Sequence, residues 1–338
     1  MHDDRPPFCL ERRTWEAPSL LAEHPPRFGH PHKRAVFALL RPSGAQPVGE
    51  AREGSPSEAQ PIVYSRWATR ELPERVPARV PAVEVHSDVF DYRGPSEGVW
   101  HANFADPSLF VAYGSSLLAQ DELQALEHPL LGAVREALLA EGLPAVTKEH
   151  GAATPVLVTG VPRQCALDTA PTLERPLGLY GNRFAAAPFD AVRAALRVFD
   201  APRPSNVLAM AAPAGGVGRY RLDQLATVLS TAFAAFAAAS DESRALWPGA
   251  AVEVRTGFWG CGAFGGNRTV MVALQLLAAR LAGLDRLAFY TVTQSGTVDF
   301  EEGTATLEAA LAERDAPVAA VLQRLLARGL QWGVSDGN

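Results

Sequence analysis

Cysteine is scarce in this chain of 338 residues. Its three cysteines, Cys9, Cys165 and Cys261, lie far apart. They give neither a disulfide framework nor a zinc-binding spacing, so we expect a reducing compartment. Lysine is rarer still, because only Lys33 and Lys148 occur and arginine supplies nearly all the positive charge. The formal net charge is -6, and a net-acidic chain lacks the basic surface that non-specific nucleic-acid binding needs. We therefore expect no nucleic-acid partner.

The chain also lacks a long uninterrupted apolar run. Residues 1–7 contain no apolar segment of the kind found in secretory signals. The most apolar stretch, Leu222–Ala239, is interrupted by acidic, amide and hydroxyl side chains, whereas a bilayer span needs ~20 mainly apolar residues. These features predict a soluble, cytoplasmic protein with a core helix at this stretch and no membrane partner. Delivery as a secreted effector would leave no mark in such a sequence.

Apolar residues make up 47% of the chain, enough for a large core. Residues 1–80 differ from the rest, because they are rich in proline, arginine and glutamate and include a polar stretch over residues 42–61. They bury too little apolar surface to fold alone. We predict a partly ordered N-terminal extension over residues 1–80, packed on a main domain over residues 81–338.

Within the main domain, apolar runs of strand length alternate with segments of helical periodicity. The predicted strands are Val83–Val85, Trp100–Phe104, Pro155–Thr159, Asn206–Ala211, Ala251–Val254 and Leu287–Val292. The predicted helices are Ser116–Glu127, Leu130–Ala140, Phe189–Val198, Leu222–Ala239, Thr269–Ala282, Ala305–Leu311 and Val318–Leu326. This alternation predicts an α/β fold with a parallel or mixed central sheet flanked by helices. Ligands of such sheets bind on the loops at the carboxyl ends of strands.

The strongest local pattern is a glycine-rich loop over residues 256–268. Five glycines follow a predicted strand and precede a predicted helix: Gly257, Gly260, Gly262, Gly265 and Gly266. Glycine lets the backbone approach a ligand and adopt positive φ, and the free N–H groups of a helix start suit a diphosphate. Trp259 and Phe264 offer flat apolar faces for a sugar or base. A tight structural turn is the alternative, but the density of glycine and aromatic residues favours a ligand loop.

A second strand–loop–helix unit covers residues 100–123. Ser115 or Ser116 is expected to cap its helix, which carries Gln120, Asp121 and Glu122 in its first two turns. Successive helix residues point about 100° apart, so the two carboxyl groups cannot share one direction. On spacing alone, they are explained as acidic residues that complement the helix dipole.

Two further patterns predict no site. Residues 213–220 look like a phosphate-binding loop, but Arg219 and Tyr220 stand where the mechanism needs a lysine and a hydroxyl residue. A nucleoside triphosphatase is therefore not expected. The histidines do not cluster, and His101 and His128 are expected to be packed or capping groups. We predict no metal and no cofactor.

Together the two strand–loop–helix units resemble the catalytic domain of poly(ADP-ribose) glycohydrolases (PARG), a family with the macrodomain fold. The family's late loop reads T-G-N-W-G-C-G-A-F-G-G-D, and residues 256–266 match it at every position except Phe258. The family's early Q-E-E motif is matched by residues 120–122 with Asp121 in place of the first Glu, and its D-F-A-N element by residues 103–106 with acid and amide exchanged. The resemblance covers roughly residues 98 to 330.

The resemblance implies a role for each matched residue. Glu122 falls on the family's catalytic acid and would serve as acid and then as base, with Asp121 orienting ribose hydroxyls or sharing the load. Tyr180, a weaker match, falls near the family's adenine-stacking tyrosine. The implied ADP-ribose-binding residues are Asn103, Phe104, Asp106, Tyr113, Gly114, Gln120, Tyr180, Trp259, Gly260, Cys261, Gly262, Ala263, Phe264, Gly265 and Gly266. Since a helix start lowers the pKa of a first-turn glutamate, the acid role requires desolvation of Glu122 or a close Asp121.

The family's triple glycine is Ala112-Tyr113-Gly114 in this chain. Tyr113 is expected to narrow or reshape the cleft near the scissile bond and so to favour a single ADP-ribose on a protein over a polymer. The expected activity is hydrolysis of the glycosidic bond between ADP-ribose and a protein acceptor, with arginine-linked ADP-ribose as one option. The partners would be ADP-ribose and ADP-ribosylated protein. The alternatives are a non-catalytic ADP-ribose-binding macrodomain and a true poly(ADP-ribose) glycohydrolase.

Overall fold

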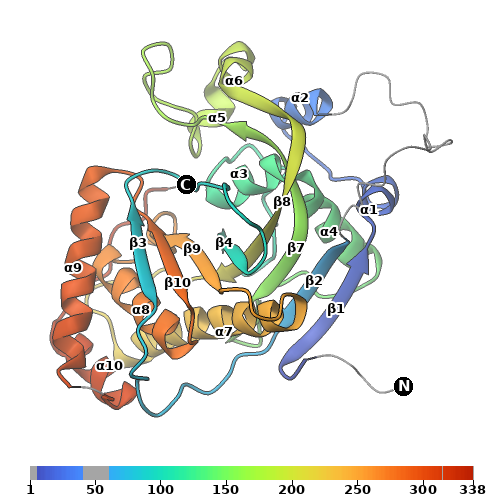
Figure 1. Cartoon of the computed structure of the whole chain (residues 1–338). Helices are drawn as coiled ribbons and strands as arrows, with labels where there is room; N and C mark the ends of the chain where they lie inside the picture. The colour runs from blue at the N-terminus through green and yellow to red at the C-terminus, as the bar shows by residue number, and fades with distance from the viewer. Residues whose placement is uncertain (1–5, 41–60, 314, 338) are drawn as a thin grey trace.

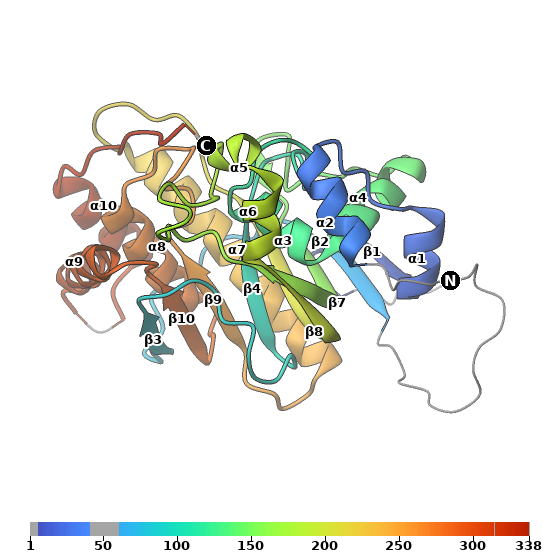
Figure 2. The ribbon, with the colours of Figure 1, turned by 90° about the horizontal axis from the view of Figure 1, so that it is seen from above.

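The computed structural model describes residues 6–40, 61–313 and 315–337. Most of the polar stretch predicted over residues 42–61 lies outside the described residues. Figure 1 shows the path of the chain, and Figure 2 shows it from above.

Eight strands form one sheet in the order β1-β2-β7-β8-β4-β9-β10-β3 (Figure 1). Their bounds are β1 Cys9–Trp15, β2 Ile62–Trp67, β3 Ala82–His86, β4 Val99–Ala105, β7 Val156–Leu167, β8 Leu196–Ala211, β9 Glu253–Gly257 and β10 Arg286–Tyr290. From β8 to β3 the neighbours run parallel, whereas β1, β2 and β7 run antiparallel to theirs. A separate hairpin pairs β5, Lys148–Glu149, with β6, Ala152–Ala153. The predicted α/β class with a mixed central sheet is confirmed.

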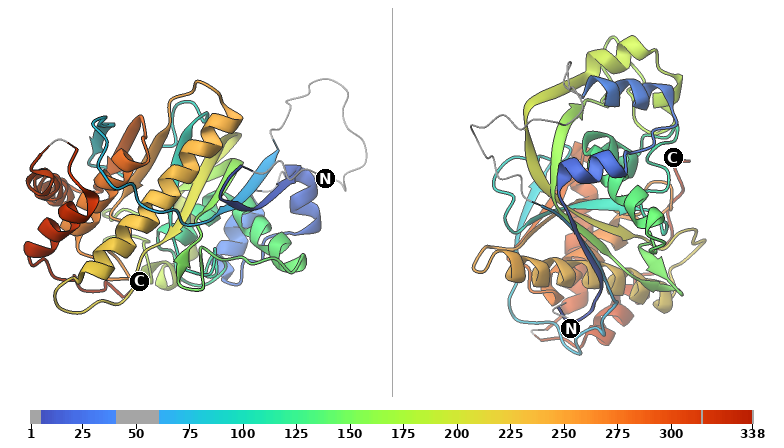
Figure 3. Two further views of the ribbon diagram at one scale, coloured as in Figure 1. Left: turned by 90° about the horizontal axis from the view of Figure 1, so that it is seen from below. Right: turned by 90° about the vertical axis from the view of Figure 1, so that its right-hand side faces the viewer.

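Helices cover both faces of this sheet. Their bounds are α1 Ala17–Glu23, α2 Pro31–Leu39, α3 Gln120–Glu127, α4 Pro129–Ala140, α5 Arg183–Ala186, α6 Phe189–Ala195, α7 Leu222–Leu246, α8 Arg268–Leu281, α9 Gln294–Leu311 and α10 Val318–Ala327. Apolar residues of α7, α8 and α10 build the core on one face, and those of α3 and α4 build the core on the other. Figure 3 shows α7 lying along the sheet.

The strands supply both cores by alternation. On β7 and β8, Leu157 and Leu208 join the core under α7 and α8, whereas Val158 and Val207 join the core under α3 and α4. Side chains of a strand point to opposite faces in turn, so a continuous apolar run suits a strand covered on both sides.

Helix α7 is the described helix that is long and apolar enough to cross a membrane, with a mean hydropathy of 1.4 over its most apolar window. Of that window, 67% is buried inside the fold. Phe233 and Phe236 lie in the core, and the Trp100 indole N–H donates to Ser243 Oγ at 2.8 Å. These contacts fit the core helix predicted from the sequence.

The N-terminal residues contribute strands to the main sheet. β1 pairs with β2, and β2 pairs with β7 from Val63 to Arg66. Tyr64 on β2 is fully buried. The domain boundary near residue 80 stays a prediction, but β1 and β2 share the cores of the residues that follow.

The predicted start of the helix over Ser116–Glu127 is wrong. The helix begins at Gln120, with Ala119 as its N-cap residue. Ser115 Oγ accepts the Leu117 N–H at 3.2 Å in a turn before the helix. The serine hydroxyl therefore stabilises the loop and caps no helix.

The predicted end of the helix over Phe189–Val198 is also wrong. α6 ends at Ala195, and β8 begins at Leu196. Val198 pairs with Cys165 across the β7–β8 ladder. Pairing with a partner strand has overridden the helical periodicity.

Candidate active site

Strands β4 and β9 lie side by side only near their starts. They pair over three residues and separate after the His101–Arg255 pair. Beyond it, the side chain of Gln120 takes the place of a strand, because its Oε1 accepts the Phe104 N–H at 2.7 Å and its Nε2 donates to the Ala102 carbonyl at 3.0 Å. The sheet thus opens at its carboxyl edge, where α/β folds bind ligands.

The glycine-rich loop connects β9 to α8 at this opening. Gly260 and Gly265 have φ of 73° and 65°, a region that glycine adopts without strain. The N–H groups of Gly265 and Gly266 donate to carbonyls of the same loop, at 3.0 and 2.8 Å. Among the described residues, the N–H groups of residues 262–264 have no such partner. Of Gly262, Gly265 and Gly266, at which the diphosphate contact is predicted, the last two therefore use their N–H groups to shape the loop, whereas Gly262 does not.

Asp121 and Glu122 lie in the first turn of α3 and are only 6% and 4% exposed. Asp121 Oδ1 accepts an N–H of the Asn103 side chain at 3.0 Å, and Glu122 Oε2 accepts the Ala119 N–H at 3.0 Å. Burial raises the pKa of Glu122. Burial, with the Glu122 charge beside it, raises the pKa of Asp121 to about 7. Desolvation thus outweighs the lowering expected from a helix start, and a carboxyl protonated near neutral pH can act as an acid.

Lys33 on α2 was missed as a site residue. Its side chain is fully buried, and its Nζ donates to the carbonyls of Tyr113 at 2.8 Å and Leu117 at 2.6 Å. Burial lowers the pKa of Lys33 to about 8, while the charges of Glu122 and Asp121 raise it. The scarcity of lysine in the chain was the one available signal.

Tyr180 lies between β7 and α5, beside the first turn of α3. Burial raises the pKa of its hydroxyl to about 12, while a hydrogen bond to the Gln120 backbone lowers it. The charges of Asp336 and Glu122 also act on this hydroxyl. The residue is 39% exposed, so part of its surface is open to a ligand.

The prediction that Tyr113 narrows the cleft is wrong. Its ring is buried, 3% exposed, and packs edge-on against Phe28. Its hydroxyl donates to Glu136 Oε1 on α4 at 2.9 Å. α4 makes room for the ring with Gly132, where a Cβ would lie 2.7 Å from the ring. Gly114, also predicted at the ligand, packs against the backbone of Arg27.

The prediction that Trp259 offers a face to a ligand is also wrong. Its ring is fully buried, and its indole N–H donates to the Met210 carbonyl at 2.9 Å. Cys261 donates to the Trp259 carbonyl at 3.7 Å, and burial raises the pKa of its thiol to about 12. Phe264 is half-buried and Ala263 is exposed, so these two side chains contribute to the loop's accessible surface.

The three predicted residues at the end of β4 lie at different depths. Asn103 is fully buried behind Asp121 and also donates to Gln124 Oε1 at 2.9 Å. Phe104 is half-buried beside Gly257. Asp106 Oδ1 accepts the Ser108 N–H at 2.8 Å and shapes the following turn. Asn103 therefore supports a carboxyl group and does not face the opening.

A C-terminal segment, residues 331–337, crosses the glycine-rich loop. Asn267 Nδ2 donates to the Gln331 carbonyl at 2.9 Å. Trp332 stacks on Tyr220 with ring centroids 4.3 Å apart, and its indole N–H donates to Gln224 Oε1 at 3.2 Å. These contacts anchor the start of the segment beside α7 and α8.

The end of the same segment reaches the other side of the opening. The Asp336 N–H donates to the Gly262 carbonyl at 3.4 Å, and a Cβ on Gly262 would lie 3.1 Å from an Asp336 carboxylate oxygen. Asn182, the residue before α5, donates from Nδ2 to the Gly337 carbonyl at 2.9 Å. Figures 1 and 2 both show the end of the chain beside α5. The segment therefore connects the loop to the Tyr180 side of the site.

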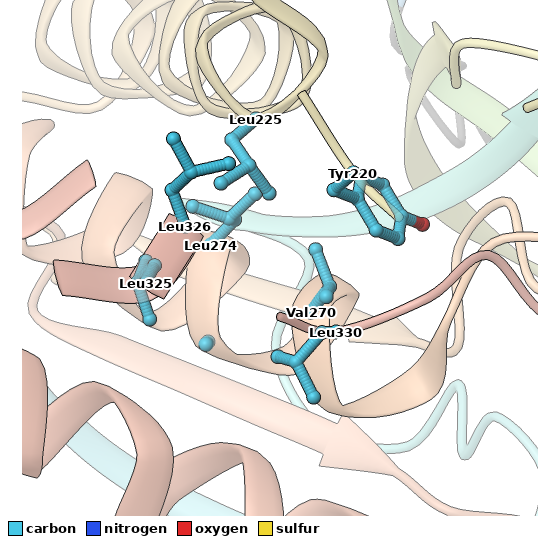
Figure 4. A pocket seen from close by; sticks show the side chains of 8 residues that line it. Tyr220, Leu225, Val270, Leu274, Leu325, Leu326 and Leu330 are labelled. Atoms are coloured by element: carbon cyan, nitrogen blue, oxygen red, sulfur yellow. The ribbon is translucent and has the colours of Figure 1, made fainter. Parts of the chain in front are cut away.

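The segment over residues 213–220 forms no phosphate site. The Trp332 indole covers Gly216, and the Tyr220 hydroxyl accepts the Asn267 N–H at 3.0 Å. A pocket opens beside Tyr220 between α7, α8 and α10 (Figure 4). Its other lining residues are Leu225, Val270, Ala273, Leu274, Leu325, Leu326 and Leu330. No charged group lines it, so it suits packing and not a diphosphate.

Over residues 6–40, 61–313 and 315–337, no cluster of three or more His, Cys, Asp or Glu side chains could hold a metal ion.

Comparison with known proteins finds a family model that matches the part of the chain containing the loop. Residues 197–299 match the family model described as poly(ADP-ribose) glycohydrolase (PARG), macrodomain fold. No curated protein matches the sequence. The match confirms the resemblance and the fold predicted from the sequence.

Solved PARG structures are similar to the chain at low identity. PARG from Deinococcus radiodurans in complex with ADP-ribose is 19% identical, over 69% of this chain and 87% of that one, with a TM-score of 0.41. The apo form from the same organism is 13% identical, over 86% and 98%, with a TM-score of 0.40. PARG from Thermomonospora curvata is 15% identical, over 69% and 79%, with a TM-score of 0.39.

Proposed function

Because the chain carries a PARG-like macrodomain, we propose that it hydrolyses the glycosidic bond between ADP-ribose and an acceptor. One arrangement carries the proposal: two buried carboxyl groups, Asp121 and Glu122, follow Gln120, which bonds to β4 where β4 parts from β9, and the glycine-rich loop follows β9. The loop lies within the residues that match the family, and α3 lies outside them. The fold therefore brings to the matched loop two acids that lie outside the residues that match the family model.

In the proposed reaction, Glu122 donates its proton to the leaving group as the bond at the anomeric carbon breaks. The sugar passes through a state resembling an oxocarbenium ion, and the Glu122 carboxylate then accepts a proton from the attacking water. The raised pKa of Glu122 supports the first step. Asp121, held by Asn103, orients the ribose hydroxyls.

The loop supplies the proposed diphosphate site. Backbone N–H groups of residues 262–264 and the start of α8 would face the phosphates. Phe264 would contact the distal ribose. Tyr180, across the opening, would line the adenine side with its exposed surface.

We favour a single ADP-ribose on a protein over a polymer. Tyr113 gives no support for this preference, because its ring lies in the core. The preference is therefore a proposal that the comparison of single and polymeric substrates decides. Arginine-linked ADP-ribose is one option for the acceptor, and the cytoplasmic location stays a prediction.

The test is incubation with proteins mono-ADP-ribosylated on arginine, glutamate or serine and with poly(ADP-ribose). Released ADP-ribose is measured by mass spectrometry. Release from a mono-ADP-ribosylated protein supports the proposal. Tight binding of ADP-ribose by isothermal titration with no release from any substrate would identify a reader domain instead.

A further inference from the structure

Lys33 lies where it can act on both proposed catalytic groups. It reaches across from α2, in the N-terminal residues, to the loop that precedes α3. Its two hydrogen bonds end on the carbonyls of Tyr113 and Leu117. Burying an ammonium group fully costs several kcal/mol of folding free energy unless hydrogen bonds and opposite charges compensate. The buried position of Lys33 therefore indicates that its charge has a role.

We propose that Lys33 is a positioning residue for Glu122 and Asp121. Its hydrogen bonds hold the backbone of residues 113–117 ahead of α3, and its positive charge faces the two carboxyl groups. The inference rests on the proposed function, and it gives the N-terminal residues a part in the site.

The charges around the pair fix the direction of the effect. The charges that act on Asp121 are those of Glu122, Asp106 and Lys33, and the charges that act on Glu122 include those of Asp106 and Lys33. In both sets Lys33 is the positive charge. On its own helix, Lys33 lies near His30 and Arg34. A nearby cation favours the ionised carboxylate. Without it, the pKa of both carboxyl groups rises.

The experiment compares Lys33→Gln and Lys33→Met with Lys148→Met, which removes the other lysine from an exposed position on β5. Lys33→Gln keeps a donor and loses the charge. We expect both Lys33 variants to shift the whole pH–rate profile to higher pH and to lower kcat at least tenfold. Lys148→Met should match the wild type.

A fall in kcat with an unmoved pH profile would overturn the inference, since it would show a structural role alone. Should the wild type hydrolyse no substrate, the proposed function fails, and Lys33 is tested on the protein by carbon NMR of the side-chain carboxyl groups. The carboxyl pKa of the pair must then rise in Lys33→Gln. An unchanged pKa would overturn the inference by this route too.

The C-terminal segment carries a second inference independently. Its Asp336 carboxylate lies beside Gly262, where an added Cβ would meet it at 3.1 Å, and Gly262 is the first of the three residues whose N–H groups are proposed to bind an anion. A carboxylate and a phosphate compete for the same backbone donors. We infer that residues 333–337 cover the anion site and leave it when ADP-ribose binds. This also rests on the proposed function.

The test uses a variant truncated after Trp332, which keeps the Trp332–Tyr220 stack, together with Asp336→Asn. If the segment covers the site in nine molecules of ten, truncation strengthens ADP-ribose binding about tenfold. Asp336→Asn should strengthen it less. Hydrogen exchange at residues 333–337 should rise when ADP-ribose is added to the full chain.

Weaker binding after truncation, or slower exchange at residues 333–337 with ligand, would show that the segment is a wall of the site, and the inference falls. Absence of ADP-ribose binding by both the full chain and the truncated variant would overturn it together with the proposed function. Binding by both with equal affinity would overturn the inference alone.

Discussion

Asn103 donates a side-chain N–H to Asp121 Oδ1 at 3.0 Å from a fully buried position on β4. It also donates to Gln124, whose Nε2 donates to the Tyr92 hydroxyl at 3.0 Å. A chain of buried polar groups therefore runs from the candidate site into the fold. Such networks fix side-chain positions, because an unpaired polar group in a core is costly. The first turn of α3 is held on both sides, by this chain and by the Gln120 bonds to β4.

Glu122→Gln removes the titratable proton of the proposed acid while keeping its size and its contact with Ala119. Acid–base catalysis contributes ~10²–10⁴-fold, so kcat should fall by about that factor. Affinity for ADP-ribose should change little by isothermal titration. The matched control is Glu141→Gln, which lies at the end of α4 and pairs with Arg13 at the surface.

Near-normal turnover by Glu122→Gln would contradict the assignment. If Asp121→Asn or Asp106→Asn then abolished turnover, an aspartate would carry the chemistry.

The pH dependence of stability tests the burial of Asp121. Its pKa is raised from 3.8 to about 7 in the folded protein. A raised carboxyl pKa stabilises the fold fully below the unfolded pKa, and this stability is lost as pH rises through the folded pKa. Denaturation by urea should therefore show the free energy of unfolding falling between pH 4 and 7. In Asp121→Asn the fall should shrink by on the order of a few kcal/mol; an unchanged slope would contradict the burial.

The sequence predicted the glycine-rich loop because its pattern depends on local order, whereas the role of the two acids was implied by the family resemblance and not by their spacing. A strand, a loop with five glycines and a helix start are neighbours in the chain, and the pattern of residues 256–266 needs no tertiary information. The alternating strands and helices likewise gave the mixed sheet.

The errors arise where tertiary packing decides. The Tyr113 ring packs into the core because Gly132 of α4 leaves space for it, and burying an aromatic ring is favourable. The Trp259 ring is likewise buried in the core that includes α7 and α8, because burying its apolar surface is favourable. Lys33 and Asp336 reach the site from opposite ends of the chain, so no local pattern could reveal either.

Gly132→Ala tests the buried position of the Tyr113 ring. The added Cβ would lie 2.7 Å from the ring and 2.9 Å from Pro26 Cβ. Overpacking of this kind costs about 1–3 kcal/mol. The melting temperature should fall, while Tyr113→Phe should leave the relative activity on single and polymeric ADP-ribose unchanged. A change in that substrate preference with Tyr113→Phe would show that the Tyr113 side chain contacts the substrate.

Gly265→Val tests whether the loop's shape is what binds the diphosphate. Gly265 has φ of 65°, and a Cβ there would lie 3.2 Å from the Ser335 nitrogen. A β-branched residue resists this backbone region, so the turn that closes between Gly265 and Gly262 should open. The N–H groups of residues 262–264 then lose their shared direction, and ADP-ribose affinity should fall at least tenfold by isothermal titration.

Gly283→Val is the matched control, because Gly283 also has positive φ, 64°, but lies after α8 with open space around it. It carries the same backbone strain and should reduce thermal stability without changing affinity. Equal ADP-ribose affinities for the folded Gly265→Val protein and the wild type would contradict the proposal that this loop binds the diphosphate.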